Sequence, residues 1–261
     1  MYRTLDSARI IDSLDTLGNR IAERFPGAGL ASVCTELSGI ARESERRIRE
    51  IGRPNLPLRL GVVAFLLAAV WLLWRIAPYL DFEKRTADNI YSVLQGVDAA
   101  MNILVLMGAT ALFLFAVEER MKRRRALAAV HELRSLIHVI DMHQLTKDPS
   151  SVAFVSQPTA SSPKRTMTPF ELTRYLDYCS ELLSLSAKVA ALYAQGLPDA
   201  VVVDAVSDVE RLTTNLSSKV WQKISLIEQH ALVAQSSAIA APKPAPAPVP
   251  PPAAAVRPAA R

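Results

Sequence analysis

Two long apolar segments dominate the pattern of hydrophobic and polar positions along the chain. Segment 58–80 has no charged residue from Leu60 through Trp74, and segment 99–117 has none at all. The second segment would span about 28 Å as a helix, close to the roughly 30 Å hydrocarbon core of a bilayer. Helices of soluble proteins rarely stay apolar on every face over this length. We therefore predict transmembrane helices at 58–80 and 99–117, joined by a short periplasmic loop at 81–98.

Basic residues beside the two apolar segments predict their orientation. The first segment follows a long charged region, so it is expected to be an anchor and not a cleaved signal peptide. Basic residues are concentrated in the two segments that flank the hairpin, and these segments would lie on the same side of the membrane. They are Arg42, Arg46, Arg47, Arg49, Arg53 and Arg59 before the hairpin and Arg120, Lys122, Arg123, Arg124 and Arg125 after it. The loop between the segments holds only Lys84 and Arg85. Because basic flanks stay in the cytoplasm, we expect both termini there.

Aromatic residues gather at the expected outer end of the first span. Trp71, Trp74 and Tyr79 fit the aromatic belt that marks a membrane–water interface. Apart from Arg59 at the start of the first span, Arg75 is the one charge inside either span, and we expect its side chain to reach up to the outer interface. The alternative is that Arg75 pairs with Asn102, which lies at a similar depth on the returning helix.

Small residues form a stripe on each predicted span. Such stripes allow membrane helices to approach closely. The stripes consist of Gly61, Ala64 and Ala68 on the first helix and of Leu104, Gly108 and Ala111 on the second. Packing of the hairpin on itself and packing against a second copy both remain open at this point.

Residues 1–57 are predicted to form a cytoplasmic helical hairpin. Apolar residues recur at three- and four-residue spacing over 6–24 and again over 30–51. Between the two helices, Phe25-Pro26-Gly27 carries the signals of a break. Prolines 54 and 57 then end the second helix before the membrane.

A second helical module is expected after the spans. Nothing breaks a helix over 118–147, so this segment should extend the second span into the cytoplasm. A linker rich in Ser, Thr and Pro covers 148–168, and a helical hairpin follows at 169–231. The hairpin and the 118–147 extension are expected to form a three-helix bundle. Residues 232–261, dominated by Ala and Pro, are predicted to be a disordered, extended tail.

Local signals place the ends of the helices in that hairpin. Thr168 and Glu171 form a capping box with Pro169 at the first helical position. Gly196 is predicted to end the same helix as a C′ glycine. The next helix is expected to begin at Pro198-Asp199, after a turn short enough for an antiparallel pair.

The composition supports an all-α fold class. Half of the 261 residues are apolar, only 9 are glycine and aromatics make up 6%. Sheets recruit aromatic and β-branched residues, so this mixture favours helices. We predict a two-span transmembrane helical hairpin with cytoplasmic helical hairpins or a bundle and a disordered C-terminal tail.

Three histidines cluster between residues 131 and 143, and this cluster raises the hypothesis of a metal site. His138 and Asp141 lie three residues apart, on one helical face, and are the weak metal candidates. His131 would sit about 10 Å along the axis from His138, too far for one ion. Ser135 with His138 and Asp141 does not converge on one reacting atom. We therefore predict no metal, no catalytic residue and no cofactor, and expect packed polar side chains instead.

The two cysteines and the basic cluster at 120–125 are assigned structural and membrane roles. Cys34 and Cys179 lie on apolar faces and are expected to be inert, reduced core thiols. The sequence has no glycine-rich phosphate loop and no CxxC zinc spacing. The basic cluster directly follows a span, so anionic lipid headgroups are its expected partner, and no nucleic acid is.

Three segments resemble a group of bacterial two-span inner-membrane proteins for which no activity is known. They are 131–149, Arg165-Thr-Met-Thr-Pro-Phe-Glu-Leu and Tyr175-Leu-Asp-Tyr-Cys-Ser, and the likeness covers roughly 58–230. The resemblance implies a location in the bacterial inner membrane, and it carries over no functional residue.

Two functions of different kinds fit this organisation. The first hypothesis is a non-enzymatic scaffold or adaptor, anchored in the membrane, whose cytoplasmic helical modules self-associate or bind a helical protein. The alternative is a homo-oligomeric channel or pore-forming effector, since two spans cannot enclose a pathway alone. The spans offer little polar lining beyond Asn102, Thr110 and Arg75.

Overall fold

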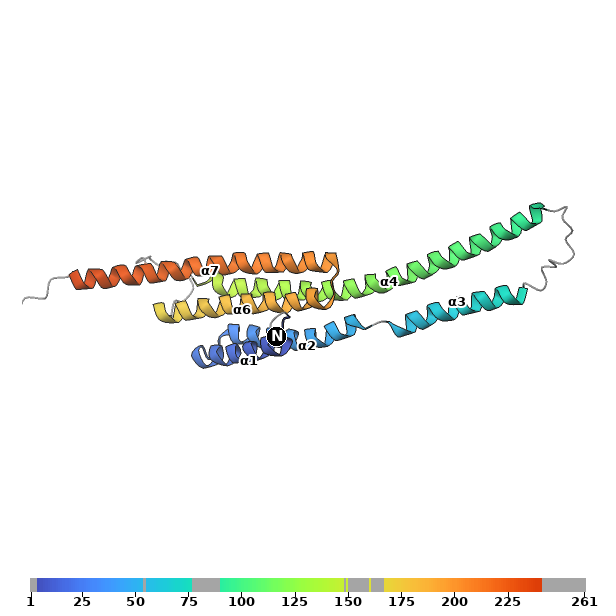
Figure 1. The fold of residues 1–261 in the computed structure, drawn as a ribbon. Helices are drawn as coiled ribbons and strands as arrows, with labels where there is room; N and C mark the ends of the chain where they lie inside the picture. Colours follow the sequence, from blue (N-terminus) through green and yellow to red (C-terminus); the bar gives the residue numbers. More distant parts are fainter. Residues whose placement is uncertain are drawn as a thin grey trace, which may run out of the picture.

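A computed structural model describes residues 4–53, 55–76, 90–147, 149, 160 and 167–240. Of these residues 91% are helical and none lies in a strand, which confirms the all-α fold class. The helices are α1 (Ser7–Arg24), α2 (Gly29–Gly52), α3 (Leu56–Ile76), α4 (Ile90–Leu145), α6 (Pro169–Gly196) and α7 (Ala200–Ala240), as drawn in Figure 1.

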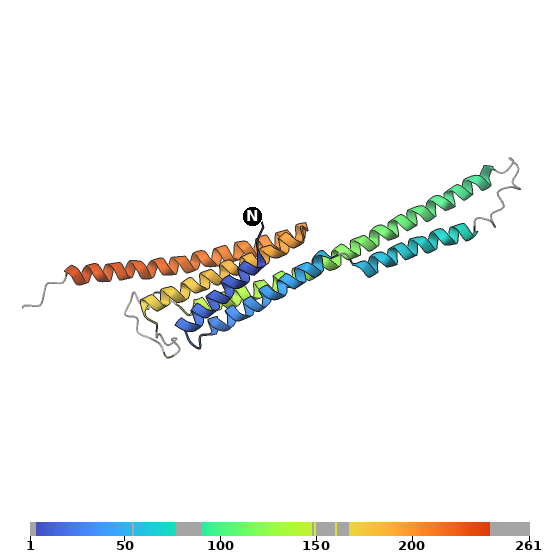
Figure 2. The ribbon, with the colours of Figure 1, turned by 60° about the horizontal axis from the view of Figure 1, so that its bottom comes forward.

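The molecule is elongated and has two parts joined by α4. Helices α2, α6 and α7 pack against the second half of α4, and α1 packs on α2 and α6. We call these helices together the helical body (Figures 1 and 2). Helix α3 and the first half of α4 project from it side by side, and we call this part the apolar hairpin. The single helix α4 therefore belongs to both parts.

A large hydrophobic core holds most of the helical body together, and a smaller cluster joins α6 to α7. Residues of α4 enter the large core at three- and four-residue spacing, and six of them are buried: Ala126, Ala129, Val130, Leu133, Ile137 and Ile140. The same core contains buried residues of α1, α2, α6 and α7. The two cytoplasmic modules expected from the sequence thus form one five-helix body, because each buries its apolar face against the other.

Local capping signals act as the sequence predicts. The Thr168 hydroxyl accepts the Glu171 backbone N–H at 3.2 Å, and the Glu171 carboxylate accepts the Thr168 N–H at 2.8 Å. Helix α1 ends at Arg24 with Phe25 as its C-cap, and Gly27 takes the left-handed conformation with φ +77°. The turn between α1 and α2 therefore depends on a residue that lacks a Cβ.

The predicted role of Gly196 is wrong. Helix α6 includes Gly196 and is capped by Leu197, and Gly27 is the one glycine with positive φ among the described residues. A Cβ at position 196 would instead lie 2.4 Å from the Ile48 Cγ2 atom on α2. Gly196 thus allows close packing of α6 against α2, a long-range constraint that a local pattern does not contain.

One predicted boundary also needs correction. Helix α7 continues to Ala240, past the hairpin end expected at 231, so the predicted tail cannot start at 232. Helix α4 begins at Ile90, ahead of the predicted span 99–117, as the apolar residues Ile90, Val93, Leu94 and Val97 indicate. Residues 81–89, most of the linker 148–168 and residues 241–261 lie outside the described residues.

The apolar hairpin contains two helical stretches long and apolar enough to cross a membrane by length and composition, with mean hydropathies of 1.8 and 2.2. Val62 on α3 is buried, and Leu66 and Ala69 are half-buried, at helical spacing toward α4. The small-residue stripes do not form this contact. Gly61, Ala64, Ala68, Leu104 and Gly108 are exposed, and only Ala111 is half-buried. Packing of the stripes against a second copy stays open.

The close contact at Gly196 predicts the effect of adding one methyl group. Gly196→Ala should destabilise the helical body by about 1 to 3 kcal/mol, because the β-branched Ile48 side chain cannot turn its Cγ2 atom away cheaply. Unfolding of the detergent-solubilised protein, followed by circular dichroism, measures this change.

Gly39 on α2 is the matched control, since a Cβ there would meet nothing within 4 Å. Gly39→Ala should stabilise the protein by about 0.5 to 1 kcal/mol through helix propensity. If both alanines stabilised the protein, the close approach of α6 to α2 would be wrong.

Candidate functional site where the body meets the apolar hairpin

Glu118 lies where the helical body meets the apolar hairpin. It is the first charged residue after the second apolar segment, and its side chain is 2% exposed. Its carboxylate accepts the Asn55 backbone N–H at 3.1 Å and Arg59 Nε at 3.3 Å, and Lys122 Nζ lies at 2.9 Å. Asn55 and Arg59 flank the start of α3, so this cluster ties α3 to α4.

These donors explain why a carboxylate can be buried at this place. A buried charge is costly unless it is paired and hydrogen-bonded. The hydrogen bond from Lys122 and then that from Asn55 lower the pKa of Glu118 to about 2, against the opposing effect of burial. Glu118 therefore stays ionised at neutral pH, and its negative charge offsets part of the surrounding basic cluster.

Arg123 makes a second tie, between α4 and α7. Its Nη2 and Nε atoms lie 2.6 and 2.9 Å from Asp199 Oδ2. Asp199 Oδ1 also accepts the backbone N–H groups of Val201 and Val202, which caps the start of α7. The pKa of Asp199 is lowered, chiefly by the Arg123 hydrogen bonds. The tip of the α6–α7 hairpin is thus fixed close to the apolar hairpin.

The predicted membrane-interface residues therefore divide into two groups. Lys122 and Arg123 form ion pairs within the fold, whereas Arg120, Arg124 and Arg125 are exposed. At the far end of α3, Trp71, Trp74 and Arg75 are also exposed, and Tyr79 lies outside the described residues. The basic residues at the body are thus partly structural, which the sequence alone did not indicate.

Arg75 and Asn102 are not joined by a hydrogen bond. The Asn102 amide donates to Asp98 on the preceding turn of α4 at 3.3 Å. The Thr110 hydroxyl likewise donates to the Leu106 carbonyl at 2.8 Å. The side chains of Asn102 and Thr110 are thus satisfied within their own helix.

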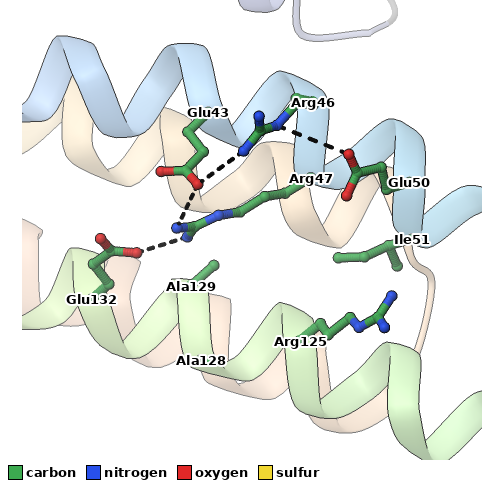
Figure 3. A pocket seen from close by; sticks show the side chains of 9 residues that line it. All are labelled: Glu43, Arg46, Arg47, Glu50, Ile51, Arg125, Ala128, Ala129 and Glu132. Carbon is green, nitrogen blue, oxygen red and sulfur yellow. Dashed lines mark hydrogen bonds and ion pairs between the residues drawn. The ribbon is translucent and has the colours of Figure 1, made fainter.

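A polar pocket of about 390 Å³ opens between α2 and α4 near the Glu118 cluster (Figure 3). Arg47 crosses it and contacts Glu132 Oε2 at 2.7 Å and Glu43 Oε1 at 3.0 Å. The hydrogen bond to Glu132 is the main cause that raises the pKa of Arg47. Arg46 lies between Glu43 and Glu50, at 3.3 and 3.9 Å. The two arginines and three glutamates form one connected network.

Arg125 is the exception in this pocket. Its side chain lies at the end where α2 finishes, beside Ile51, as Figure 3 shows. No ion pair of Arg125 occurs within the part of the chain that the structure describes. The apolar side chains of Ala128 and Ala129 line the pocket beside it. The pocket thus offers one unpaired guanidinium next to an apolar wall.

The weak metal candidates lie apart from this pocket. His138 is exposed on α4, and the Asp141 carboxylate accepts a hydrogen bond from Gln144. His143 Nδ1 lies 3.4 Å from the Tyr175 hydroxyl, inside the helical body. Among the described residues no group of three or more His, Cys, Asp and Glu side chains could hold a metal ion.

Both cysteines are buried in the core, as the sequence predicts. Burial is the main cause that raises the pKa of Cys34 to about 11 and that of Cys179 to about 12. Since the thiolate is the reactive form, neither thiol is activated at neutral pH.

The sequence did not predict a groove that lies on the surface of the helical body. It runs over α6 between α1 and α7 and contains two adjoining hollows of about 560 Å³ each. Both are lined by Ser184, Lys188 and Trp221, and Trp221 is 55% exposed. A tryptophan on the polar face of the predicted last helix was the signal that could have located this groove.

No family model, curated protein or solved structure matches this chain.

The Glu118 cluster predicts a defined pH dependence of stability. The carboxyl titrates near 4.5 when unfolded and near 2 when folded, so its ionised form stabilises the fold. That contribution is complete above about pH 4.5 and is lost as the pH falls toward 2. Glu118→Gln should lower the unfolding free energy at pH 7 by on the order of 3 kcal/mol. The difference from wild type should shrink as the pH falls from 4.5 to 2.

The neighbouring Glu119 provides the control, because it is exposed and lies 3.7 Å from the same Lys122. Glu119→Gln should cost less than about 1 kcal/mol at any pH. Denaturant unfolding in detergent micelles measures all three proteins. A Glu118→Gln effect that stayed constant between pH 7 and 3 would contradict the role given to the buried carboxylate.

Proposed function

We propose that this protein is a membrane-anchored scaffold, without catalytic activity of its own, that holds a helical body at the cytoplasmic face of a bacterial inner membrane. The observation that carries this proposal is the continuity of α4. This helix runs unbroken from Ile90 to Leu145, exposed and apolar in its first half and buried in the core of the body in its second. The body is therefore attached to its anchor without a flexible linker.

Charge and burial support the proposed orientation. The exposed arginines Arg53, Arg120, Arg124 and Arg125 surround the junction of the body with the apolar hairpin. In a membrane they lie at the level of anionic headgroups, where each basic residue contributes about 1 kcal/mol. The first and last described helices, α1 and α7, both belong to the body (Figures 1 and 2), which supports a single side of the membrane for both of them.

The groove over α6 is the proposed binding surface for a helical protein partner. Its floor contains the small side chains of Ser184, Ala187 and Ala191, which leave room for another helix. Helices α1 and α7 form its walls, and Trp221 offers a large exposed aromatic surface. Tryptophan is enriched among the residues that dominate binding energy at protein interfaces.

The channel alternative is less well supported. A conducting pathway needs polar groups that face a pore. The polar side chains of Asn102 and Thr110 instead hydrogen-bond within α4, and the exposed surface of the apolar hairpin is mainly aliphatic.

Photo-crosslinking in native membranes tests the scaffold proposal. A benzophenone amino acid at Ser184, in the groove, should give a defined adduct with a helical protein, identified by mass spectrometry. The same probe at Val139, on the exposed face of α4, is the positional control. Trp221→Ala should reduce the Ser184 adduct about tenfold or more, as loss of a dominant contact does.

Leu226→Ala is the matched control substitution, since Leu226 is exposed on the same helix outside the groove. It should leave the adduct unchanged. Equal adduct yields from Ser184 and Val139 would contradict a partner in the groove. So would a Ser184 adduct whose yield is unchanged by Trp221→Ala. An adduct with a second copy of this chain would identify the partner as the protein itself.

A further inference from the structure

The pocket between α2 and α4 carries equal numbers of opposite charges. It is lined by three arginines and three glutamates, Arg46, Arg47, Arg125, Glu43, Glu50 and Glu132. Arg47 is held by two glutamates at 3.0 Å or less, so it cannot take a new partner without losing these contacts. Two groups are more available: Arg125 has no ion pair among the described residues, and Glu50 has only the 3.9 Å contact with Arg46.

These two groups lie at the same end of the pocket. Figure 3 shows Arg125 and Glu50 on either side of Ile51, where α2 reaches its last turn. That end leads toward Glu118 and the apolar hairpin, because α2 ends at Gly52 and Asn55 already contacts Glu118. The opening thus combines a cation, an anion and an apolar side chain.

The depth of Arg125 suits a phospholipid headgroup. Its backbone lies about 12 Å along α4 from Val117, the last residue of the predicted span. The headgroup region on each side of a bilayer is about 5 to 7 Å thick. Helical side chains point back toward the N-terminus of their helix, which for α4 is the membrane side. An extended Arg125 side chain therefore brings its guanidinium back to the level of the lipid phosphates.

We propose that this pocket binds the headgroup of a zwitterionic aminophospholipid, with the phosphate on Arg125 and the ammonium group on Glu50. Guanidinium groups bind phosphate through charge-assisted, often bidentate hydrogen bonds. A pocket of zero net charge disfavours an added anion but accepts a headgroup that carries both signs. This site rests on the membrane orientation in the proposed function and is independent of the groove over α6.

Binding of soluble short-chain lipids to the full chain in detergent tests this site. Dihexanoyl phosphatidylethanolamine should bind as one saturable equivalent per chain, measured by titration calorimetry and by native mass spectrometry. Arg125→Ala should weaken binding about tenfold or more, since it removes the phosphate contact. Arg125→Lys should restore part of it, and Glu50→Gln should remove the preference over dihexanoyl phosphatidylglycerol.

Arg124→Ala is the matched control, because Arg124 is the adjacent exposed arginine outside the pocket. It should leave the affinity unchanged. Equal losses from Arg124→Ala and Arg125→Ala would mean diffuse attraction to lipid, and would overturn the site. So would phosphatidylglycerol binding as tightly as phosphatidylethanolamine, or inorganic phosphate competing at equal concentration. Because these lipids are soluble, their binding does not depend on the groove or on the membrane anchor. A negative result would therefore contradict the pocket alone.

Discussion

A peptide group inside hydrocarbon finds no water to bond with, so a chain that crosses a bilayer must satisfy its backbone within a helix. In this protein the same constraint extends beyond the proposed membrane segment, because α4 does not end where its apolar exposed half ends. Its second half buries six apolar residues among four other helices. The rotation of α4 about its axis is thus set by the core of the body, and the orientation of the apolar hairpin follows from it.

Charges at the junction reinforce this coupling. Turning or sliding α3 against α4 would leave Glu118 buried without Asn55 and Arg59, and an unpaired buried carboxylate is strongly destabilising. Arg123 and Asp199 add the tip of the α6–α7 hairpin to the same rigid region. The proposed groove and the proposed lipid pocket are therefore both held at fixed positions relative to the anchor, which is the property that a scaffold needs.

Local sequence signals predicted the helices and their caps well. The capping box at Thr168 and the break at Gly27 depend on neighbouring residues only, and both occur as expected. Contacts between distant segments could not be predicted from the local sequence pattern. The local sequence around Gly196 predicts a helix terminator, but the glycine instead allows a close contact with Ile48 on α2. Arg123 belongs to a basic cluster in the sequence, yet it pairs with Asp199, an acid that only the fold brings near. The groove beside Trp221 was not predicted either, because it forms only where the fold places α1 next to α6 and α7.

Cysteine accessibility along α4 tests the central claim most directly. Asp98→Cys and Ser135→Cys place single exposed thiols on the two halves of this one helix, while the native Cys34 and Cys179 are buried. In intact cells, a membrane-impermeant maleimide should label position 98 and should reach position 135 only after the membrane is opened. Labelling of both positions in intact cells, or of neither until the membrane is opened, would show that α4 does not cross the bilayer.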